Sequence, residues 1–502
     1  MEPFQFFGFL WLVHSTKIAL FYLYLWQLKE YHTGRFLAHF DTDKGRKLIF
    51  NPISILKIIL LLVFSVMPLL TFFGTIIIYL LEFPKIFFDL IKNKIKKPVL
   101  TKKTAFLFLA ILIFEFGLIF LISATMGFWE NFEIFSDSNR IVIFTFWLLF
   151  FDVFGPVIFS IVILLFQPLT FFLRNRILNK AKLKREKFKD LLVVGITGSY
   201  GKTSTKEFLY SILAERFGEK TLKTKEHQNS EVGISQCILN DLNEAHEIFI
   251  VEMGAYNVGG IKLLCDIVKP KIGILTGINE QHMATFGSQE NIIKAKYELI
   301  ESLPPDGTAF FNGKNEHCLR LYSQTNIKKF LYGQSIEFSG MENIEVAKMV
   351  AKELGMTQEE INRAVDKIDN KFGGITIKNG INGLKIIDAT FSANPDSVIA
   401  HLEYLKGRSG KKILVMPCLI ELSGASKEVH RRIGKKIGEI CDLAIITTKD
   451  YFKEIQKTAG TKAIFMDNPK KIFEKIKSFT KESDVILLES RVPKKLIGQL
   501  MM

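Results

Sequence analysis

Cysteine is scarce in this chain: there are five in 502 residues, and no two stand in a Cys-x-x-Cys pair. This excludes the paired spacing of zinc ribbons and the dense cysteine framework of small secreted domains, and it argues against zinc. We expect buried, reduced thiols, as in cytosolic proteins. The five residues are Cys237, Cys265, Cys318, Cys418 and Cys441.

The chain also has no internal repeat, no low-complexity tract and no basic stripe interleaved with aromatic residues. The last absence argues against a nucleic-acid groove, although the net charge is +15. Residues 1–190 hold 23 Lys and Arg against 13 Asp and Glu, and this excess lies between and after apolar segments. We therefore interpret the basic charge as membrane topology and contact with anionic lipid, and we expect no nucleic-acid partner.

Long apolar runs fill the first third of the chain. Hydrophobic residues make up 48% of the sequence, and four stretches each exceed the about 20 residues that cross a bilayer. The first stretch has neither the basic start nor the small-residue site of a cleaved signal peptide. We predict an α-helical membrane domain over residues 1–185, with apolar stretches at 4–26, 55–83, 104–128 and 141–173.

Charges between the stretches predict their orientation. Segments 84–103 and 174–189 are rich in Lys and Arg and are expected inside, whereas the acidic segment 129–140 is expected outside. Segment 27–54 conflicts, because four simple spans put it outside although it holds five basic residues. A re-entrant hairpin at Pro68 would place this segment inside and the N-terminus outside; a Pro-kinked span is the alternative. The expected location is a multi-pass protein of the cell membrane whose C-terminal part lies in the cytoplasm.

Three ionisable residues lie within the apolar stretches: Lys17, Glu115 and Asp152. Such groups are costly in lipid and are often functional. The plainer interpretation is that Lys17 reaches the interface and that the carboxylates pair inside the helical bundle. Residues 84–97 alternate apolar and basic at helical spacing, which suits an interfacial helix.

From residue 191 the pattern changes to alternating strands and helices, which is typical of parallel sheets. We predict two α/β domains, over 186–372 and 373–502, the second of them Rossmann-like. The first set has strands at 191–194, 248–252, 271–276 and 308–312, with helices at 203–217 and 290–303. The second set has strands at 385–388, 411–416, 443–448, 463–466 and 485–489, with helices at 397–405 and 426–440.

A glycine-rich turn directly follows the first of these strands. Residues 195–206 read Gly-Ile-Thr-Gly-Ser-Tyr-Gly-Lys-Thr-Ser-Thr-Lys, a strand that turns into a helix. Such a turn directs backbone N–H groups and a helix N-terminus at a phosphate. Lys202 would add charge near the terminal phosphates, and the Thr203 hydroxyl would bind Mg²⁺. The chain is therefore predicted to bind a nucleoside triphosphate.

The turn is not a strict Walker A motif, because Ile196 stands where that motif has glycine. It matches Thr-Gly-x-x-Gly-Lys-Thr over 197–203, and this variant resembles the Mur ligase family, which builds the peptide stem of bacterial peptidoglycan. The resemblance extends over about residues 186–502, with further matches in the family's order. They are Val251-Glu252-Met253-Gly254-Ala255, residues 276–282 followed by Phe286-Gly287-Ser288, Lys294-Ala295-Lys296, Ala393-Asn394-Pro395-Asp396-Ser397, and Glu421-Leu422 followed by His430.

The resemblance implies a P-loop central domain, a Rossmann-like C-terminal domain and an ADP-forming, ATP-dependent acid–amino-acid ligase with Mg²⁺ as cofactor. ATP would convert a carboxylate into an acyl phosphate, which an amine then attacks; a phosphate loop, a lysine and metal ions stabilise the phosphoryl charge. The implied nucleotide-binding residues are Gly198, Ser199, Gly201, Lys202, Thr203, Ser204 and Asn394. The implied metal ligands are Thr203 and Glu252 for the first Mg²⁺, and His282 and a carbamylated Lys296 for the second. Catalysis is assigned to Lys202, His282, Lys296 and Asn229, the last near the γ-phosphate.

The nearest branch of the family adds D-Ala-D-Ala to a UDP-linked muramoyl tripeptide. The expected partners are therefore a muropeptide acceptor, nucleotide- or lipid-linked, an amino acid or dipeptide, and membrane lipids. The family's UDP-sugar-binding domain has no counterpart here, and apolar segments stand in its place, which suggests a lipid-linked or membrane-proximal acceptor. Other departures affect the substrate side: Glu342 for histidine, Phe372-Gly373-Gly374 without arginine, Ala389 beside Asp388, Phe391-Ser392, Pro417-Cys418, and Thr276-Gly277-Ile278-Asn279.

Two alternatives stay open. One is a ligase for another polymer, such as poly-glutamate, although the motifs after residue 370 favour the peptidoglycan branch. The other is a degenerate ligase that serves as an ATP-binding membrane scaffold. The lost aspartate and arginine of the family's pattern favour it, whereas the retained Lys202, Glu252, His282 and Lys296 argue against it. A transporter ATPase would need a signature helper motif and a strand-end aspartate for Mg²⁺, and the sequence has neither.

Overall fold

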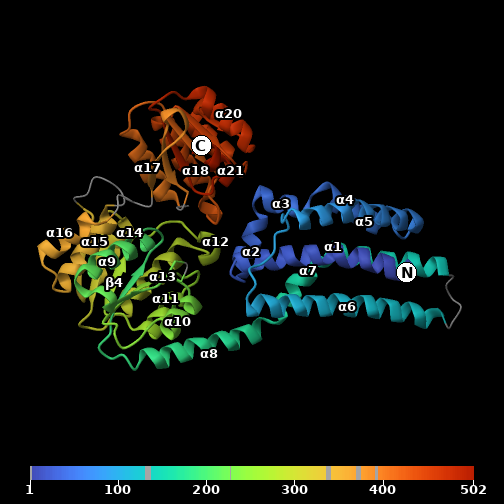
Figure 1. Ribbon diagram of the computed structural model, residues 1–502, viewed down its shortest axis with the longest axis horizontal. Coiled ribbons are helices and arrows are strands. Elements are labelled where there is room, and N and C mark those ends of the chain that lie inside the picture. Colours follow the sequence, from blue (N-terminus) through green and yellow to red (C-terminus); the bar gives the residue numbers. More distant parts are fainter. Residues whose placement is uncertain are drawn as a thin grey trace. The chain divides into compact units, whose positions relative to one another are not determined.

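The structure is a computed structural model that describes residues 3–130, 137–226, 228–334, 341–368, 375–390 and 394–501. It divides into two compact units, Met1–Leu173 and Arg174–Met502, and each is described by itself. The first unit is helical, and the second holds two six-stranded sheets (Figure 1).

The helical unit is built from long apolar helices that lie alongside one another (Figure 1). Within the described residues, four segments are long and apolar enough to cross a membrane: Gln5–Leu28, Pro68–Ile91, Lys102–Thr125 and Arg140–Leu165. The helices are α1 (Pro3–Leu28), α2 (Thr33–Phe40), α3 (Asp43–Ile49), α4 (Pro52–Val63), α5 (Pro68–Ile91), α6 (Lys102–Glu130) and α7 (Asp137–Leu165).

The second apolar stretch is a helical hairpin rather than one kinked helix. Helix α4 ends at Val63 and α5 begins at Pro68, since Met67 leaves the helical conformation and proline fits the first position of a new helix. The two helices pack closely: the Thr71 hydroxyl donates to the Leu60 carbonyl over 2.8 Å, and a Cβ atom on Gly74 would meet the Leu60 side chain at 2.9 Å. With 12 residues, α4 is about 18 Å long, too short to cross a bilayer core of about 30 Å.

The ionisable residues predicted within the apolar stretches are paired. Glu115 accepts a hydrogen bond of 2.6 Å from Ser15, and Lys17 lies 3.8 Å from Asp89. Asp152 belongs to a buried polar cluster contributed by four helices. Its members are His14 of α1, Lys57 of α4, Tyr79 and Glu82 of α5, and Asp152 of α7.

The two basic segments of this unit meet at the same end of the bundle. Gln27, at the end of α1, exchanges two hydrogen bonds with the backbone of Val99, of 3.0 and 2.7 Å. Beside them, the Lys103 ammonium lies 3.6 Å from the centre of the Tyr31 ring, and Gln167 donates to the Tyr31 carbonyl. Segments 27–54 and 84–103 therefore share an end, as the re-entrant arrangement requires.

Helix α8 (Gln167–Arg185) leads into the second unit. Its last turns belong to the core of the central domain, because Leu178 and Ala181 are buried there and Arg185 donates to the carbonyls of Val268 and Leu191. The central sheet is parallel throughout, in the order β2-β3-β1-β4-β5-β6. Its strands are β1 (Leu192–Thr197), β2 (Thr221–Lys223), β3 (Ile248–Glu252), β4 (Ile272–Leu275), β5 (Thr308–Asn312) and β6 (Lys328–Tyr332).

Helices cover both faces of the central sheet, each over a separate apolar core (Figure 1). One face carries α9 (Lys202–Phe217), α15 (Glu342–Glu353) and α16 (Gln358–Asp366). The other carries α10 (Glu231–Asn240), α11 (Gly260–Val268), α13 (Gln289–Glu301) and α14 (Glu316–Gln324), and the short α12 (Met283–Phe286) precedes α13.

The C-terminal sheet has the order β11-β10-β9-β12-β8-β7, with β7 antiparallel to its neighbour. Its strands are β7 (Thr376–Asn379), β8 (Lys385–Ala389), β9 (Lys412–Met416), β10 (Leu443–Ile446), β11 (Ala463–Phe465) and β12 (Val485–Glu489). One face is covered by α17 (Pro395–Lys406), α18 (Ser426–Ile440) and α19 (Phe452–Ala459), the other by α20 (Pro469–Phe479) and α21 (Lys494–Leu500). The prediction of two α/β sheets after the helical part is confirmed.

Candidate active site

The glycine-rich turn has the backbone shape of a phosphate loop. It joins the end of β1 to the start of α9, and its two glycines have positive φ, 152° at Gly198 and 76° at Gly201. A Cβ atom on Gly198 would lie 2.1 Å from the Thr276 hydroxyl, and one on Gly201 would lie 2.7 Å from Asn343. Both positions therefore require glycine. The first N–H groups of α9 have no acceptor within the helix and are available to an anion.

Glu252 stands at the centre of a polar group beside this loop. It ends β3, next to β1 in the sheet, with Glu252 in register with Ile196. One carboxylate oxygen accepts from the Thr203 hydroxyl over 2.9 Å, and the other accepts from the Asn229 amide over 3.1 Å. The Lys206 ammonium lies 3.5 Å away. The structure thus brings Thr203, Asn229 and Glu252 together, as predicted.

Two lysines without carboxylate partners lie close to one another. Lys202 is partly buried and donates to the Gly198 carbonyl over 2.7 Å, and burial lowers the pKa of its ammonium. Lys296 of α13 is buried; burial and then the charge of Lys202 lower the pKa of Lys296 to about 7. Neither lysine forms an ion pair in the described part of the chain, although the Glu252 charge opposes the lowering of the pKa of Lys202 and the Glu298 charge that of Lys296. This arrangement suits an anionic ligand, and it gives Lys296 a neutral amine near pH 7.

His282 is held by a carboxylate from the C-terminal domain. The residue has φ 65° and precedes α12, and its Nδ1 lies 2.9 Å from a Glu421 carboxylate oxygen. Burial lowers the pKa of His282, which keeps the imidazole neutral, and the Nδ1–H then donates to Glu421. The Nε2 lone pair of His282 is left for a ligand, the arrangement usual for a metal-binding histidine.

The loop before His282 also contacts the C-terminal domain. The Asn279 amide donates to Asn394 and to Asp396, each over 3.1 Å. The neighbouring Glu280 forms an ion pair with Arg432 of α18 over 3.2 Å. Both α/β domains therefore contribute side chains to one continuous site.

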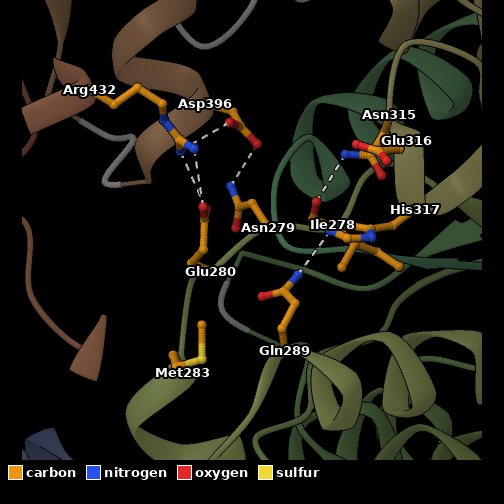
Figure 2. A pocket seen from close by; sticks show the side chains of 10 residues that line it. All are labelled: Ile278, Asn279, Glu280, Met283, Gln289, Asn315, Glu316, His317, Asp396 and Arg432. Carbon is orange, nitrogen blue, oxygen red and sulfur yellow. Dashed lines mark hydrogen bonds and ion pairs between the residues drawn. The ribbon is translucent and has the colours of Figure 1, made fainter. Parts of the chain in front are cut away.

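A cavity of about 280 Å³ opens between these contacts (Figure 2). It adjoins the phosphate loop, because the Ser199 hydroxyl accepts from the Asn279 backbone N–H over 3.2 Å and the Tyr200 hydroxyl lies 3.4 Å from the Asn315 amide. Amide, carboxylate and apolar side chains line it. The lining residues are Ile278, Asn279, Glu280, Met283, Gln289, Asn315, Glu316, His317, Asp396 and Arg432.

Most of the predicted residues thus gather around the loop. Ser204 lies in the first turn of α9, with its side chain half-buried. Asn394 is buried at the start of α17 and meets the cavity through Asn279 rather than lining it. His430 does not line the cavity: it is fully buried and accepts from the Leu419 backbone N–H, so it supports its own domain.

Sequence reasoning missed the cavity's contribution from Gln289, Asn315 and Arg432. Arg432 lies in a helix with several basic residues, where one arginine gives no signal of its own. Two predicted departures, at 372–374 and 391–392, lie outside the described residues, as does Ala393 of the matching motif at 393–397. Asp388 is described, and it pairs within its own domain with Lys378 over 2.8 Å and accepts from Thr390.

A phosphate loop joined to a second α/β domain defines a class of nucleotide-dependent enzymes, and the sequence places the chain within it. Residues 196–395 match the Mur ligase middle domain, and residues 375–491 match the Mur ligase, glutamate ligase domain. The two matches together cover more than half of the chain, and the chain belongs to the Mur ligase family.

Its similar relatives include two ligases with the same name. The UDP-N-acetylmuramoyl-tripeptide–D-alanyl-D-alanine ligase of Synechocystis is 29% identical over 271 residues, 49% of this chain and 59% of the relative. That of Bacillus subtilis is 26% identical over 276 residues, 49% of this chain and 60% of the relative. The chain spans about three fifths of the length of these curated relatives.

Solved structures share the fold of the second unit. MurF from Acinetobacter baumannii has a TM-score of 0.60 at 23% identity, and covers 65% of this chain and 80% of its own. MurF ligase from Thermotoga maritima, solved in complex with ADP, has a TM-score of 0.56 at 25% identity, over 64% of this chain and 83% of its own.

Proposed function

We propose that this protein is a membrane-anchored, ATP-dependent amide ligase of Mur type that acts in peptidoglycan stem-peptide synthesis. The observation that carries the proposal is the group around the phosphate loop. Glu252 there is held between Thr203 and Asn229, Lys202 is close enough for the Glu252 charge to oppose the lowering of its pKa by burial, and Lys296 in turn lies near Lys202. The names of the relatives support D-Ala-D-Ala addition to a muramoyl tripeptide as the reaction.

The residues present fit two magnesium ions. Hydroxyl and carboxylate oxygens are ligands that Mg²⁺ prefers, and Thr203 and Glu252 offer them 2.9 Å apart at the start of α9. We assign the second ion to His282 Nε2 and Lys296. The neutral Lys296 amine can add to carbon dioxide, forming a C–N bond and releasing a proton, and the resulting carbamate presents oxygen ligands. Bound Mg²⁺ would offset phosphoryl charge.

The cavity is assigned to the nucleoside half of ATP. It shares the Ser199–Asn279 contact with the phosphate loop, so a nucleotide whose phosphates lie on the loop extends into it. The amides of Gln289 and Asn315 can hydrogen-bond a base, and Ile278 and Met283 give it apolar contact. The complex of the Thermotoga maritima ligase with ADP is consistent with this assignment.

The reaction follows from the arrangement. A substrate carboxylate oxygen attacks the γ-phosphorus of ATP, and the bond to ADP breaks to give an acyl phosphate. Lys202 and the N–H groups at the start of α9 stabilise the charge on the transferring oxygens. The amine nitrogen of the second substrate then attacks the acyl carbon, phosphate leaves, and the ammonium loses a proton. Asn229, bonded to Glu252, is placed to orient the acyl group.

The helical unit is assigned to the membrane. We place the basic end, with segments 27–54 and 84–103, at the cytoplasmic side, and the short α4 enters and leaves by that side with α5. The acidic segment 129–140 then lies outside, and anionic lipids contact the basic end. An acceptor held at this membrane, nucleotide- or lipid-linked, would be within reach of the ligase.

Cysteine labelling tests this topology. The five native cysteines are all buried in the second unit, so a Phe40→Cys variant carries one accessible thiol. We expect a membrane-impermeant maleimide to label it in inverted vesicles and not in intact cells. Labelling from outside the cell would contradict the re-entrant arrangement and support four simple spans.

Phosphate release from ATP by the detergent-solubilised protein tests the activity. D-Ala-D-Ala and single amino acids, glutamate among them, are screened against nucleotide-linked and lipid-linked muropeptides, with Lys202→Ala as control. Turnover that needs both an acceptor and an amine, and that the control lacks, supports the proposal and identifies the substrates. ATP binding without turnover for any pair would favour a scaffold, and turnover with glutamate alone would favour a poly-glutamate ligase.

A further inference from the structure

Arg432 stands out among the residues of the cavity. It comes from α18 of the C-terminal domain, and it is the only Lys or Arg that lines the cavity as described. Its guanidinium nitrogens lie 3.2 and 3.5 Å from the two carboxylate oxygens of Glu280 and 3.9 Å from Asp396 (Figure 2). One cation therefore stands against two carboxylates at the cavity wall.

Two buried polar atoms at this cavity have no hydrogen-bond partner within the described residues. One is the Nε of Arg432, a donor, and the other is the amide oxygen of Gln289, an acceptor. In Figure 2 the Gln289 oxygen points toward the middle of the cavity, while its nitrogen faces His317. A buried donor or acceptor without a partner costs stability. The wall of the cavity therefore holds a donor and an acceptor that the described residues leave unused.

Arg432 supplies the positive charge that balances the carboxylates of the cavity when an anionic ligand binds. Glu280, Glu316 and Asp396 line it, and each carboxylate would repel a nucleotide phosphate. A guanidinium keeps its charge at all working pH values, and its planar face can also stack on a base. Removing it would leave Glu280 and Asp396 uncompensated beside the nucleotide.

We propose that Arg432 is a nucleotide-binding residue, supplied to the central domain's phosphate loop by the C-terminal domain. The inference rests on the proposed function, since it takes the cavity as the site of the nucleoside. The Glu280 and Asp396 carboxylates hold the guanidinium at the wall, where its charge and its accessible face serve the nucleotide. Binding of ATP and contact between the two domains are thereby linked through one side chain.

The chain offers a matched control in the preceding residue. Arg431 lies on the same helix and carries the same charge, but it pairs with Glu454 of its own domain over 2.7 Å and does not line the cavity. A second variant, Glu280→Gln, breaks the ion pair between the domains and leaves the guanidinium in place. Comparing Arg432→Ala, Arg431→Ala and Glu280→Gln distinguishes a direct contact with the ligand from an ion pair that only joins the two domains.

The test is calorimetric binding of Mg·ADP to the full-length protein in detergent, with thermal unfolding to show that each variant is folded. We expect Arg432→Ala to weaken binding about tenfold or more, Arg432→Lys to recover part of it, and Arg431→Ala to stay within about twofold. Glu280→Gln should bind as tightly as the parent or tighter, because it removes a negative charge.

Equal weakening by Arg432→Ala and Glu280→Gln would show that the pair is only a strut and would overturn the inference. Binding unchanged in Arg432→Ala would overturn it too. The proposed function fails separately: a parent protein that binds no ADP, or a Lys202→Ala variant that binds it equally well, would remove the nucleotide site itself.

Discussion

Buried charge is handled in opposite ways in the two units of the molecule. In the helical unit, Lys57 is buried and lies 3.1 Å from Glu82 and 2.9 Å from Asp152. In the second unit, Arg174–Met502, which we call the ligase unit, Lys296 is buried and Lys202 is partly buried. Neither has an ion pair in the described chain, and burial together with the charge of Lys202 lowers the pKa of Lys296. Pairing offsets the cost of burying each charge, whereas a buried lysine without a carboxylate partner either loses its proton or needs an anionic ligand. We therefore interpret the Lys57 cluster as structural and the region of Lys202 and Lys296 as a ligand-binding site.

The largest expected effect comes from removing a lysine of the site. Lys202→Ala should lower ATP-dependent turnover by at least about 100-fold, because the charge that meets the transferring phosphoryl group is lost. Phosphate release measures this. Lys271→Ala is the control, since that lysine pairs with Asp306 at the surface. If Lys202→Ala keeps parental turnover, Lys202 does not stabilise the transferring phosphoryl group.

Removing the paired lysine should damage the fold instead. Lys57→Met leaves Glu82 and Asp152 with only His14 as a basic partner in the cluster and should lower stability by about 3–5 kcal/mol. Lys17→Met breaks an ion pair of 3.8 Å whose side chains are about a third exposed, and should cost less than about 1 kcal/mol. Thermal unfolding in detergent compares the two. A Lys57→Met protein of parental stability would contradict the structural role given to the paired lysine of the helical unit.

Two carboxylates of the C-terminal domain sharpen the comparison within the ligase unit. Glu421→Gln weakens the group that orients His282 and should lower turnover about 10–100-fold, with a raised requirement for Mg²⁺. Asp388→Asn changes a carboxylate bound to Lys378 in its own sheet and should stay within about threefold. Equal effects in a magnesium titration would show that the His282–Glu421 contact has no metal-related role.

Lys296 predicts a dependence on pH and carbon dioxide. Its pKa of about 7 makes the reactive neutral amine the minor form below pH 7 and the major form above it. Activity should therefore rise roughly tenfold from pH 6 to pH 8, and added bicarbonate should raise it most at the acidic end. Turnover rates in buffers with and without carbon dioxide check this. No response to bicarbonate at any pH would exclude the carbamate.

Local sequence patterns were enough to predict much of the secondary structure of the ligase unit. The apolar strand followed by the glycine-rich turn predicted β1, the loop and α9, because one short segment holds the whole pattern. Strands β2, β6 and β7 were missed; they lie at or next to sheet edges, have three to five residues and carry exposed or half-buried polar side chains. Such strands form because the adjacent strand provides backbone hydrogen-bonding partners, and this pairing leaves no local pattern in the sequence.

Contacts between distant elements could not be predicted. The Lys57–Asp152 pair depends on how α4 and α7 are rotated, and the residues of the cavity come from segments more than 100 positions apart. Pro68 did mark the break between α4 and α5, because proline favours the first turn of a new helix, but the sequence alone left a kinked span equally open.

The most direct test of the account is to trap the acyl phosphate. The parent protein and Lys202→Ala are incubated with ATP, Mg²⁺ and the muropeptide acceptor but no amine, treated with borohydride, and analysed by mass spectrometry. We predict that the parent yields the acceptor with its carboxyl group reduced to an alcohol, and that Lys202→Ala yields none. ADP formed without any reduced acceptor, or no nucleotide consumption in the presence of an acceptor that binds, would contradict the assignment of Lys202 and the phosphate loop to phosphoryl transfer.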